Sequence, residues 1–192
     1  MPKPNVRDQL ITASLATLHR QGFNATSVQD ITEAAGVPKG SFYNHFASKE
    51  ALGVEVVRLY SERAAALQAV LHDASLAPLA RLRRYFEAMI EANVSAAFAC
   101  GCLLGNFSTE LSAQSEPIRA EVSTSYQHWA DALARIIAQA QQDGSVAATE
   151  PAAELAQSAV DAWQGAVLRA KTEQNRSPLD RFMHTLFDKI LQ

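Results

Sequence analysis

Hydrophobic residues recur at spacings of three and four along most of the chain, with polar residues between them. This spacing places apolar side chains on one face of an α-helix, whereas the strict alternation of a β-strand is almost absent. The longest regular run contains Ile118, Val122, Tyr126, Trp129, Leu133, Ile136 and Ala140. The pattern predicts an all-α protein with about nine helices and no sheet.

Glycine and proline residues mark where these helices begin and end. Gly22 is placed to close the first helix, because glycine readily adopts the left-handed conformation that ends helices. Pro151 opens a later helix at a position that tolerates proline. A long helix beginning near Ser48 joins the first part of the chain to the rest. We expect the domain boundary there, with one domain over residues 1–50 and a larger one over residues 51–192.

The overall charge argues against nucleic-acid binding by the whole molecular surface. The chain has 17 Lys and Arg residues against 20 Asp and Glu residues, a formal net charge of −3. Residues 1–50 nevertheless contain five basic and four acidic residues. No acidic residue lies between Glu33 and Glu50, so any nucleic-acid contact belongs in this locally basic stretch.

Cysteine, histidine and hydropathy patterns exclude several classes of protein. Cys100 and Cys102 are too few and too close together for a scaffold held by disulfides. A zinc site would need further ligands, and neither His72 nor His128 has the spacing of one. No apolar run reaches the length of a transmembrane helix. We expect a cytoplasmic protein without a metal, a cofactor or a membrane contact.

The segment around residue 36 has the pattern of two short helices joined by a tight turn. Ser27 precedes Asp30 by three residues, as in a capping box with Asp replacing Glu or Gln. Gly36 permits the turn, and Pro38 suits the start of the second helix. This arrangement predicts a helix-turn-helix motif.

In such a motif the start of the second helix enters the major groove of DNA. Phe42 and Phe46 lie four residues apart and face the core, which turns the residues between them outward. A solvated turn with two helix caps is the alternative for any single residue of the segment. The ordered set favours DNA binding by residues at the helix start and on the outward face, and by the helix beginning after Ser48: Lys39, Gly40, Ser41, Tyr43, Asn44, His45 and Lys49.

The stretch TSVQDITEAAGVPKGSFYNHFASKEAL resembles the DNA-binding signature of the tetracycline-repressor (TetR) family, over about residues 8–55. The resemblance implies that three N-terminal helices bind a double-stranded operator and that the larger C-terminal helical bundle dimerises and senses a ligand. Family contact positions correspond to Gln29, Lys39, Gly40, Ser41, Tyr43, His45 and Lys49. With the cap residue Ser27 and the outward Asn44, they form the expected DNA-binding set.

Two C-terminal helices are candidates for a homodimer interface. The helix after Pro151 contains many small residues that permit close helix approach, and the last helix has a dense apolar stripe. The expected interface residues are Ala159, Ala166, Ala170, Phe182 and Leu186. The same faces could equally fill the core of a monomer, and the family resemblance favours the dimer.

Aromatic residues of the C-terminal part are candidates for a ligand pocket. The expected set is Phe86, Met89, Phe107, Tyr126, Trp129 and Trp163, with Asn93 as a polar group that orients the ligand. Aromatic residues at helical spacing more often form plain core, so the expectation concerns a pocket somewhere among them.

The segment CGCLLGNFSTELS resembles the effector domain of the electrophile-responsive, N-ethylmaleimide reductase repressor type within the family. The segment GAVLRAKTEQNRSPLD, which contains Lys171, is similar to the corresponding later part of that domain. The resemblance implies that Cys102 is an effector residue near Lys171. Inert packing of both cysteines is the alternative.

These observations favour a dimeric repressor that a small molecule or a thiol modification releases from its operator. One alternative is an α-helical, thiol-dependent enzyme, although neither a Ser-His-Asp order nor a phosphate-binding loop supports catalysis. The other is a repressor with inert cysteines that responds to a non-covalent apolar ligand.

Overall fold

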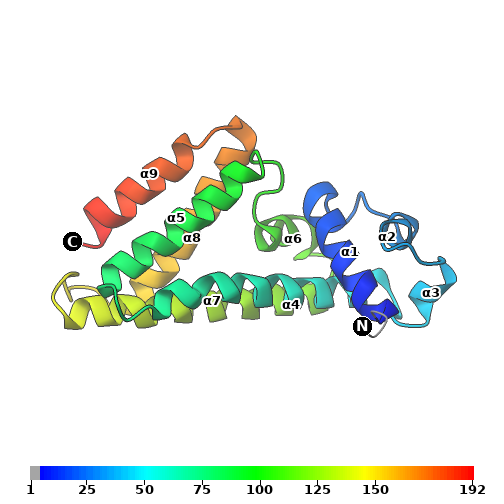
Figure 1. Cartoon of the computed structure of the whole chain (residues 1–192), viewed down its shortest axis with the longest axis horizontal. Helices are drawn as coiled ribbons and strands as arrows, with labels where there is room; N and C mark the ends of the chain where they lie inside the picture. The colour runs from blue at the N-terminus through cyan, green and yellow to red at the C-terminus, as the bar shows by residue number, and fades with distance from the viewer. Residues whose placement is uncertain (1–4) are drawn as a thin grey trace. The chain divides into compact units, whose positions relative to one another are not determined.

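A computed structural model describes residues 5–192, and every regular element in this range is a helix (Figure 1). The nine α-helices of this range are α1 Val6–Gln21, α2 Val28–Ala34, α3 Gly40–Tyr43, α4 Lys49–Leu67, α5 Pro78–Ser95, α6 Leu103–Leu111, α7 Glu116–Gln142, α8 Ala152–Glu173 and α9 Ser177–Thr185. A 3₁₀ turn, Gln68–His72, follows α4, and a π-helical turn, Leu186–Ile190, follows α9. The all-α expectation is confirmed.

The chain divides into two compact units. The first unit contains the residues up to Arg63 together with Leu103–Ser125, and the second contains Ala64–Cys102 and Tyr126–Gln192. Both α4 and α7 therefore contribute residues to each unit. The expected functional boundary at residue 50 concerns which residues bind DNA, and it stays a prediction.

Helix α1 has a polar cap at its start and a glycine at its end. The Asn5 side chain accepts a hydrogen bond from the Arg7 backbone N–H at 3.1 Å. The Gly22 N–H donates to the Leu18 carbonyl at 2.9 Å, so the helix ends where the sequence predicts. One face of the helix is buried by Leu10, Ile11, Ser14, Leu15 and Leu18.

Helix α2 begins with the capping box predicted from Ser27 and Asp30. The Ser27 hydroxyl accepts from the Asp30 N–H at 3.1 Å, and the Asp30 carboxylate accepts from the Ser27 N–H at 2.7 Å. These bonds hold the pKa of Asp30 below its usual value, because they favour the ionised carboxylate. Two backbone donors that a helix start leaves unpaired are thereby satisfied.

A glycine-dependent turn joins α2 to α3. The Val37 N–H donates to the Thr32 carbonyl and the Gly36 N–H to the Glu33 carbonyl, each at 3.0 Å. This pair of bonds is a Schellman motif, with Gly36 in its left-handed position at φ +66°. No atom lies within 4 Å of the position that a Cβ at Gly36 would occupy. The turn therefore needs glycine for its backbone conformation alone.

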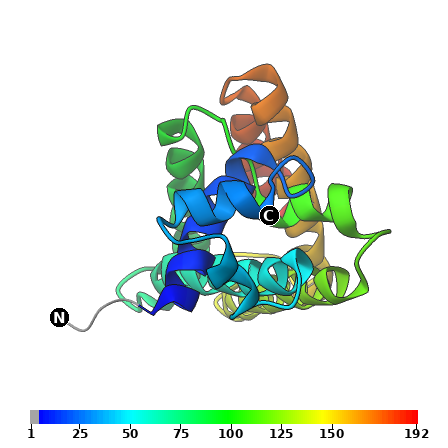
Figure 2. The ribbon, with the colours of Figure 1, turned by 90° about the vertical axis from the view of Figure 1, so that its right-hand side faces the viewer.

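The three N-terminal helices pack on one another around a small apolar core (Figure 2). Ile31 of α2 and Phe42 of α3 are fully buried, and Phe46 packs against Phe42 with ring centroids 5.6 Å apart. The two phenylalanines thus face inward, as their spacing predicts. The residues between them are left on the outside of the motif.

Helices α6 and α7 complete the first unit by packing on α1 and α4. The Phe107 ring of α6 meets the Phe23 ring edge to face, with centroids 5.7 Å apart. A Cβ on Gly53 of α4 would lie 2.9 Å from Ile118 of α7 and 3.0 Å from Phe23. Glycine at this position therefore lets α4 approach both neighbours closely.

An aromatic cluster forms the centre of the second unit, where α5, α8 and α9 lie side by side (Figure 1). The Phe86 ring lies 5.5 Å from Trp163, 4.9 Å from Phe182 and 6.4 Å from Phe187, measured between centroids. Trp163 and Phe182 also meet edge to face at 5.2 Å. Contacts of this kind stabilise a helix bundle beyond the area they bury.

Replacing Gly36 tests whether the α2–α3 turn depends on the left-handed backbone. Gly36→Ala should lower the free energy of unfolding by about 1–2 kcal/mol, since the added Cβ meets no neighbour and only the backbone conformation opposes it. Gly36→Asn should cost less, because asparagine tolerates this conformation better. Urea-induced unfolding measures both values, and an alanine variant as stable as the parent chain would contradict the assignment.

Candidate DNA-binding site

The second helix of the helix-turn-helix motif extends beyond the four residues of α3. The Ser41 N–H donates to the Pro38 carbonyl at 2.9 Å, and the His45 N–H donates to the Phe42 carbonyl at 3.0 Å. Pro38 thus precedes α3 and supplies the first acceptor, without needing a backbone N–H of its own. A continuous set of turns runs from Pro38 to Phe46.

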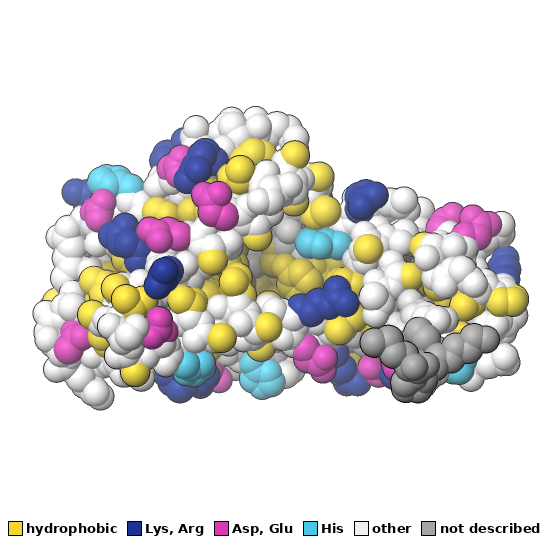
Figure 3. Space-filling model, in the orientation of Figure 1, with side chains coloured by type: hydrophobic (Ala, Val, Ile, Leu, Met, Phe, Trp, Pro, Cys, Tyr) yellow, Lys and Arg dark blue, Asp and Glu magenta, His cyan; other side chains and the backbone are white. Residues whose placement is uncertain are grey.

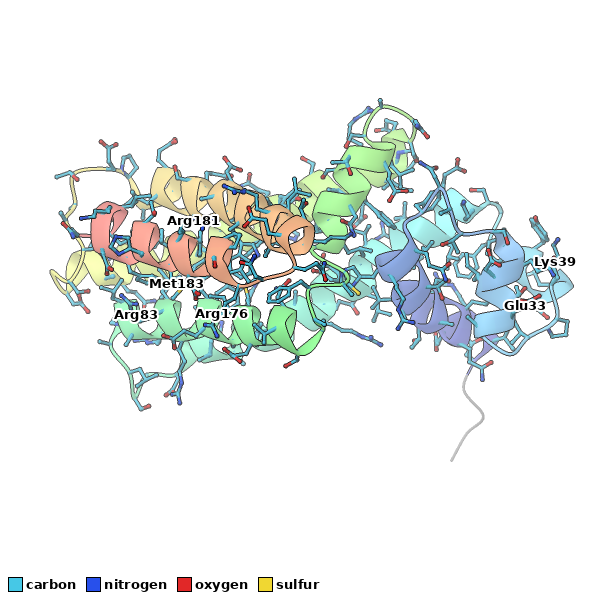
Figure 4. All side chains as sticks on the ribbon, turned by 90° about the horizontal axis from the view of Figure 1, so that it is seen from above. Glu33, Lys39, Arg83, Arg176, Arg181 and Met183 are labelled. Carbon is cyan, nitrogen blue, oxygen red and sulfur yellow. The ribbon has the colours of Figure 1, made fainter. Side chains whose placement is uncertain are left out.

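The outward face of this segment holds most of the residues expected to contact DNA. Lys39 stands at its start and projects away from the neighbouring helices (Figure 4). Tyr43 is 62% exposed although its ring meets the buried Phe42, so a rigid base supports an accessible hydroxyl. Ser41 is half-buried, and the other outward residues are exposed: Gly40, Asn44 and His45.

Two expected contacts on α2 already have partners within the helix. The Gln29 amide donates to the Glu33 carboxylate at 2.8 Å. The Ser27 hydroxyl accepts from the α2 backbone. Ser27 and Gln29 are nevertheless exposed, so both remain on the surface of the motif.

Lys49 has a different environment from the one its place at a helix start suggests. Its ammonium donates to the backbone carbonyls of Phe23 at 3.0 Å and Thr26 at 2.9 Å. It also lies 4.3 Å from the centroid of the Phe23 ring. Burial lowers the pKa of Lys49, with Glu50 and Glu110 opposing that shift. The charged group is therefore directed at the α1–α2 turn, not at the outer surface.

The same turn is also held from α6. The Glu110 carboxylate accepts a hydrogen bond from the Asn24 backbone N–H at 2.9 Å. Nothing in the sequence near Glu110 indicates this contact, which joins residues 86 positions apart. The α1–α2 turn is thus bonded by Lys49 at the start of α4 and by Glu110 near the end of α6.

The residues expected at a dimer interface are buried within the second unit itself. Ala159 and Ala170 of α8 are 1% exposed, and the other three also belong to its apolar core: Ala166, Phe182 and Leu186. Their side chains pack between α8, α9 and α5, and the expected interface stays a prediction. A shallow groove on the outside of α8 and α9 is lined by three of these residues, Ala166, Phe182 and Leu186, together with others that include Ala162, Gly165, Arg169, Arg181 and Ile190.

The outer surface of α5 and α9 has mixed charge (Figure 3). Arg176 pairs with Asp180 at 3.1 Å and Arg83 with Asp188 at 3.6 Å, and both arginines lie on this surface (Figure 4). Such interleaved ion pairs do not make the continuous basic patch that DNA phosphates attract.

The expected effector residues do not form one group. Phe86, Trp129 and Trp163 are buried in the second unit, with Met89 and Tyr126 packed against them. Phe107 belongs to the first unit, because α6 turns it against Phe23. Asn93 donates its amide to the Met89 carbonyl at 2.9 Å, so its polar group is bonded to its own helix.

The connector between α5 and α6, residues 96–102, holds both cysteines. Ala97, Phe98 and Gly101 all have positive φ, which is strained for the two residues that are not glycine. Both thiols are free of disulfides and half-buried.

Two side chains of α8 bond to this connector. The Gln164 amide donates to the Cys102 sulfur at 3.4 Å. The Lys171 ammonium donates to the Cys100 carbonyl at 3.3 Å. Sequence reasoning missed Gln164, whose pattern on α8 is that of an ordinary polar surface position.

Within residues 5–192, no three His, Cys, Asp or Glu side chains gather in a way that could hold a metal ion. None of the helices there is long and apolar enough to cross a bilayer.

Removing the Lys49 ammonium tests its part in holding the α1–α2 turn. Lys49→Met keeps the aliphatic stem but leaves the carbonyls of Phe23 and Thr26 without this donor, and should lower the free energy of unfolding by about 1–2 kcal/mol. Lys39→Met is the matched control, since that side chain is exposed. Equal stability of the two variants in urea would contradict the assignment.

Two family models match the chain. Residues 10–56 match the family described as bacterial regulatory proteins, tetR family, and residues 78–186 match the tetracyclin repressor-like C-terminal domain. The first match contains the helix-turn-helix motif, and the second runs from the start of α5 to the end of α9.

Relatives and solved structures resemble the chain over nearly its whole length. It is 40% identical to the HTH-type transcriptional repressor DhaR of Mycobacterium sp. (strain GP1), over 100% of the chain and 95% of that protein. It is 38% identical to the transcriptional regulator AcuR of Cereibacter sphaeroides, over 92% of the chain and 81% of that protein.

Among solved structures, a regulatory protein TetR from Rhodobacter sphaeroides has a TM-score of 0.89 and 35% identity, over 94% of this chain and 96% of that one. The reduced form of NemR from Escherichia coli has a TM-score of 0.83 and 25% identity, over 95% and 96%. The helix-turn-helix geometry and these matches agree: the chain belongs to the TetR family of bacterial transcription regulators and is not an enzyme.

Proposed function

We propose that this chain represses transcription by binding a roughly palindromic operator as a homodimer in the bacterial cytoplasm. A small molecule or a thiol modification acting on the second unit releases it. The observation that supports this proposal best is the outward face around α3, where Lys39 and Tyr43 are exposed and the Tyr43 ring packs on the buried Phe42. The relatives named as repressors support the direction of regulation.

The chemistry of the outward face suits DNA. Lys39 at the start of the segment is placed to reach a guanine edge or a phosphate. Gly40 has no side chain and lets the backbone approach the groove closely. The hydroxyls of Ser41 and Tyr43, with Asn44 and His45 beside them, suit phosphate and base contacts. We give Lys49 an indirect part, which is to hold the turn that orients α2 and α3.

Dimerisation would use the outer groove of α8 and α9, which Ala166, Phe182 and Leu186 help to line, and not the fully buried Ala159 and Ala170. The groove lined by Gly165, Ile190 and their neighbours is apolar enough to pack against a second copy. Two heads related by a twofold axis would read half-sites ~34–36 Å apart, the spacing of successive major-groove faces. In this division of labour, residues 1–50 bind DNA and residues 51–192 dimerise and sense the ligand.

The DNA proposal predicts that Lys39 contributes to both affinity and specificity. Lys39→Ala should weaken operator binding about 10-fold and reduce the slope of log affinity against log salt by about 1, because one phosphate or base contact is lost. Lys189→Ala is the matched control, since it removes the same charge from the exposed end of the chain. Electrophoretic mobility shifts at several salt concentrations measure both variants.

The outcome that contradicts the DNA proposal is operator affinity of Lys39→Ala equal to that of Lys189→Ala. The stoichiometry of the same complexes tests the dimer. Two chains per palindromic operator support it, whereas tight, specific binding of one chain to one half-site would overturn it.

Cys102 is the residue through which we propose that thiol reagents act. Its sulfur accepts from Gln164, and the next residue, Leu103, begins α6. Helix α6 bonds the α1–α2 turn through Glu110. An adduct on the half-buried sulfur would displace the Gln164 amide and add volume beside packed side chains, which cores resist. Because the connector leads directly into α6, displacement of the connector would shift α6 and so disturb its bond to the α1–α2 turn of the DNA-binding motif.

Alkylation by N-ethylmaleimide tests this route. Treatment should lower operator affinity about 10-fold in the parent chain, since added core volume typically costs ~1–3 kcal/mol and 1.4 kcal/mol is a factor of ten. Cys102→Ser should bind the operator and resist the reagent, whereas Cys100→Ser should still respond. If Cys102→Ser is released at the same dose, or if alkylated parent chain keeps full affinity, the cysteines are inert and a non-covalent ligand is the effector.

A further inference from the structure

The core of the second unit contains a polar group that the packing does not satisfy. Trp129 of α7 is only 8% exposed, and its indole N–H has no hydrogen-bond partner. Within residues 5–192 it is the one buried side-chain nitrogen or oxygen atom in this condition. A buried donor left unpaired costs free energy, so such atoms in an otherwise satisfied core call for a functional explanation.

A second polar group lies beside it. The Tyr85 hydroxyl of α5 is 2% exposed and interacts with the side chains of Trp129 and Gln68. The indole N–H and this hydroxyl are neighbours, yet they do not meet at the distance and angle of a hydrogen bond. Burial raises the pKa of Tyr85, so its hydroxyl stays protonated at physiological pH and can donate.

The surroundings of this pair define what could bind there. Apart from Gln68, the core around them is apolar, and every buried polar or charged residue in the described range other than Tyr85 and the tryptophans lies in the first unit. The Lys171 ammonium of α8 bonds the Cys100 carbonyl. An ionised carboxylate would therefore lack a countercharge, whereas a neutral oxygen acceptor would satisfy the donors at little cost.

We propose that Trp129 and Tyr85 form the donor end of the effector site, where they bind the carbonyl oxygen of a neutral, mostly apolar small molecule. This inference rests on the proposed function, in which the second unit senses a ligand. Met89 and Tyr126 are partly buried and pack against the same core. The flexible Met89 thioether can repack around an apolar body while the carbonyl reaches the two donors.

A matched pair of probes isolates the carbonyl. 1-Indanone and indane have nearly the same shape, and only the ketone offers an acceptor. Calorimetric titration should show 1-indanone binding the parent chain about 5- to 10-fold more tightly than indane, the value of one net hydrogen bond. The preference should shrink below about 2-fold in Trp129→Phe, which keeps an aromatic ring but loses the N–H, and should fall in Tyr85→Phe.

Controls separate this effect from general damage to the fold. Tyr60→Phe removes a tyrosine hydroxyl from the first unit and should keep the full preference for the ketone. Thermal unfolding shows which variants fold, and Tyr85→Phe keeps the test valid if Trp129→Phe does not. If N–H loss strongly destabilises the folded Trp129→Phe chain, the indole is a structural donor and the proposal is wrong.

Operator binding by the unliganded parent chain is measured first, so that failure of the proposed function is seen separately. With specific DNA binding established, added 1-indanone should lower operator occupancy more than indane does. Four outcomes would each overturn the assignment of Trp129 and Tyr85. The two probes could bind equally, or neither could bind at millimolar concentration. Indane-1-carboxylate could bind more tightly than the ketone, or the preference for the ketone could survive both substitutions.

Discussion

The arrangement of the first unit depends on the ammonium group of Lys49. It stands where two backbone carbonyls of the α1–α2 turn point inward, and it satisfies both while its charge rests over the Phe23 ring. A neutral side chain could not donate to both oxygens with equal strength, and an exposed cation would leave the turn without support. Because Lys49 is the first residue of α4, the same bonds set where that long helix meets the DNA-binding motif.

Two residues of α6 also contact the α1–α2 turn that Lys49 holds. Glu110 bonds the Asn24 N–H, and Phe107 from the same helix packs on the ring over which the ammonium lies. The α1–α2 turn therefore has one partner from α4 and two from α6. Helix α6 also follows directly on the strained connector with its two cysteines, the segment through which we propose that thiol reagents act.

Sequence patterns were sufficient for the features that local chemistry determines. Ser27 and Asp30 form the cap, Gly22 and Gly36 take the positive φ values at the helix ends, and Phe42 and Phe46 face inward. Patterns were insufficient where the outcome depends on distant residues. The inward turn of Lys49 needs carbonyls more than 20 positions away, and the burial of Ala159 and Ala170 depends on which face of α8 the other helices cover. An apolar stripe has the same spacing whether it faces its own core or a second chain.

The Schellman turn between α2 and α3 makes the backbone geometry of the motif independent of the side chains on its outward face. Its bonds run from backbone to backbone, and the space beside Gly36 is empty. The angle between the two helices therefore owes nothing to the side chains exposed on the outward face. Substitutions among those side chains would therefore leave the turn, and the backbone that presents them, intact.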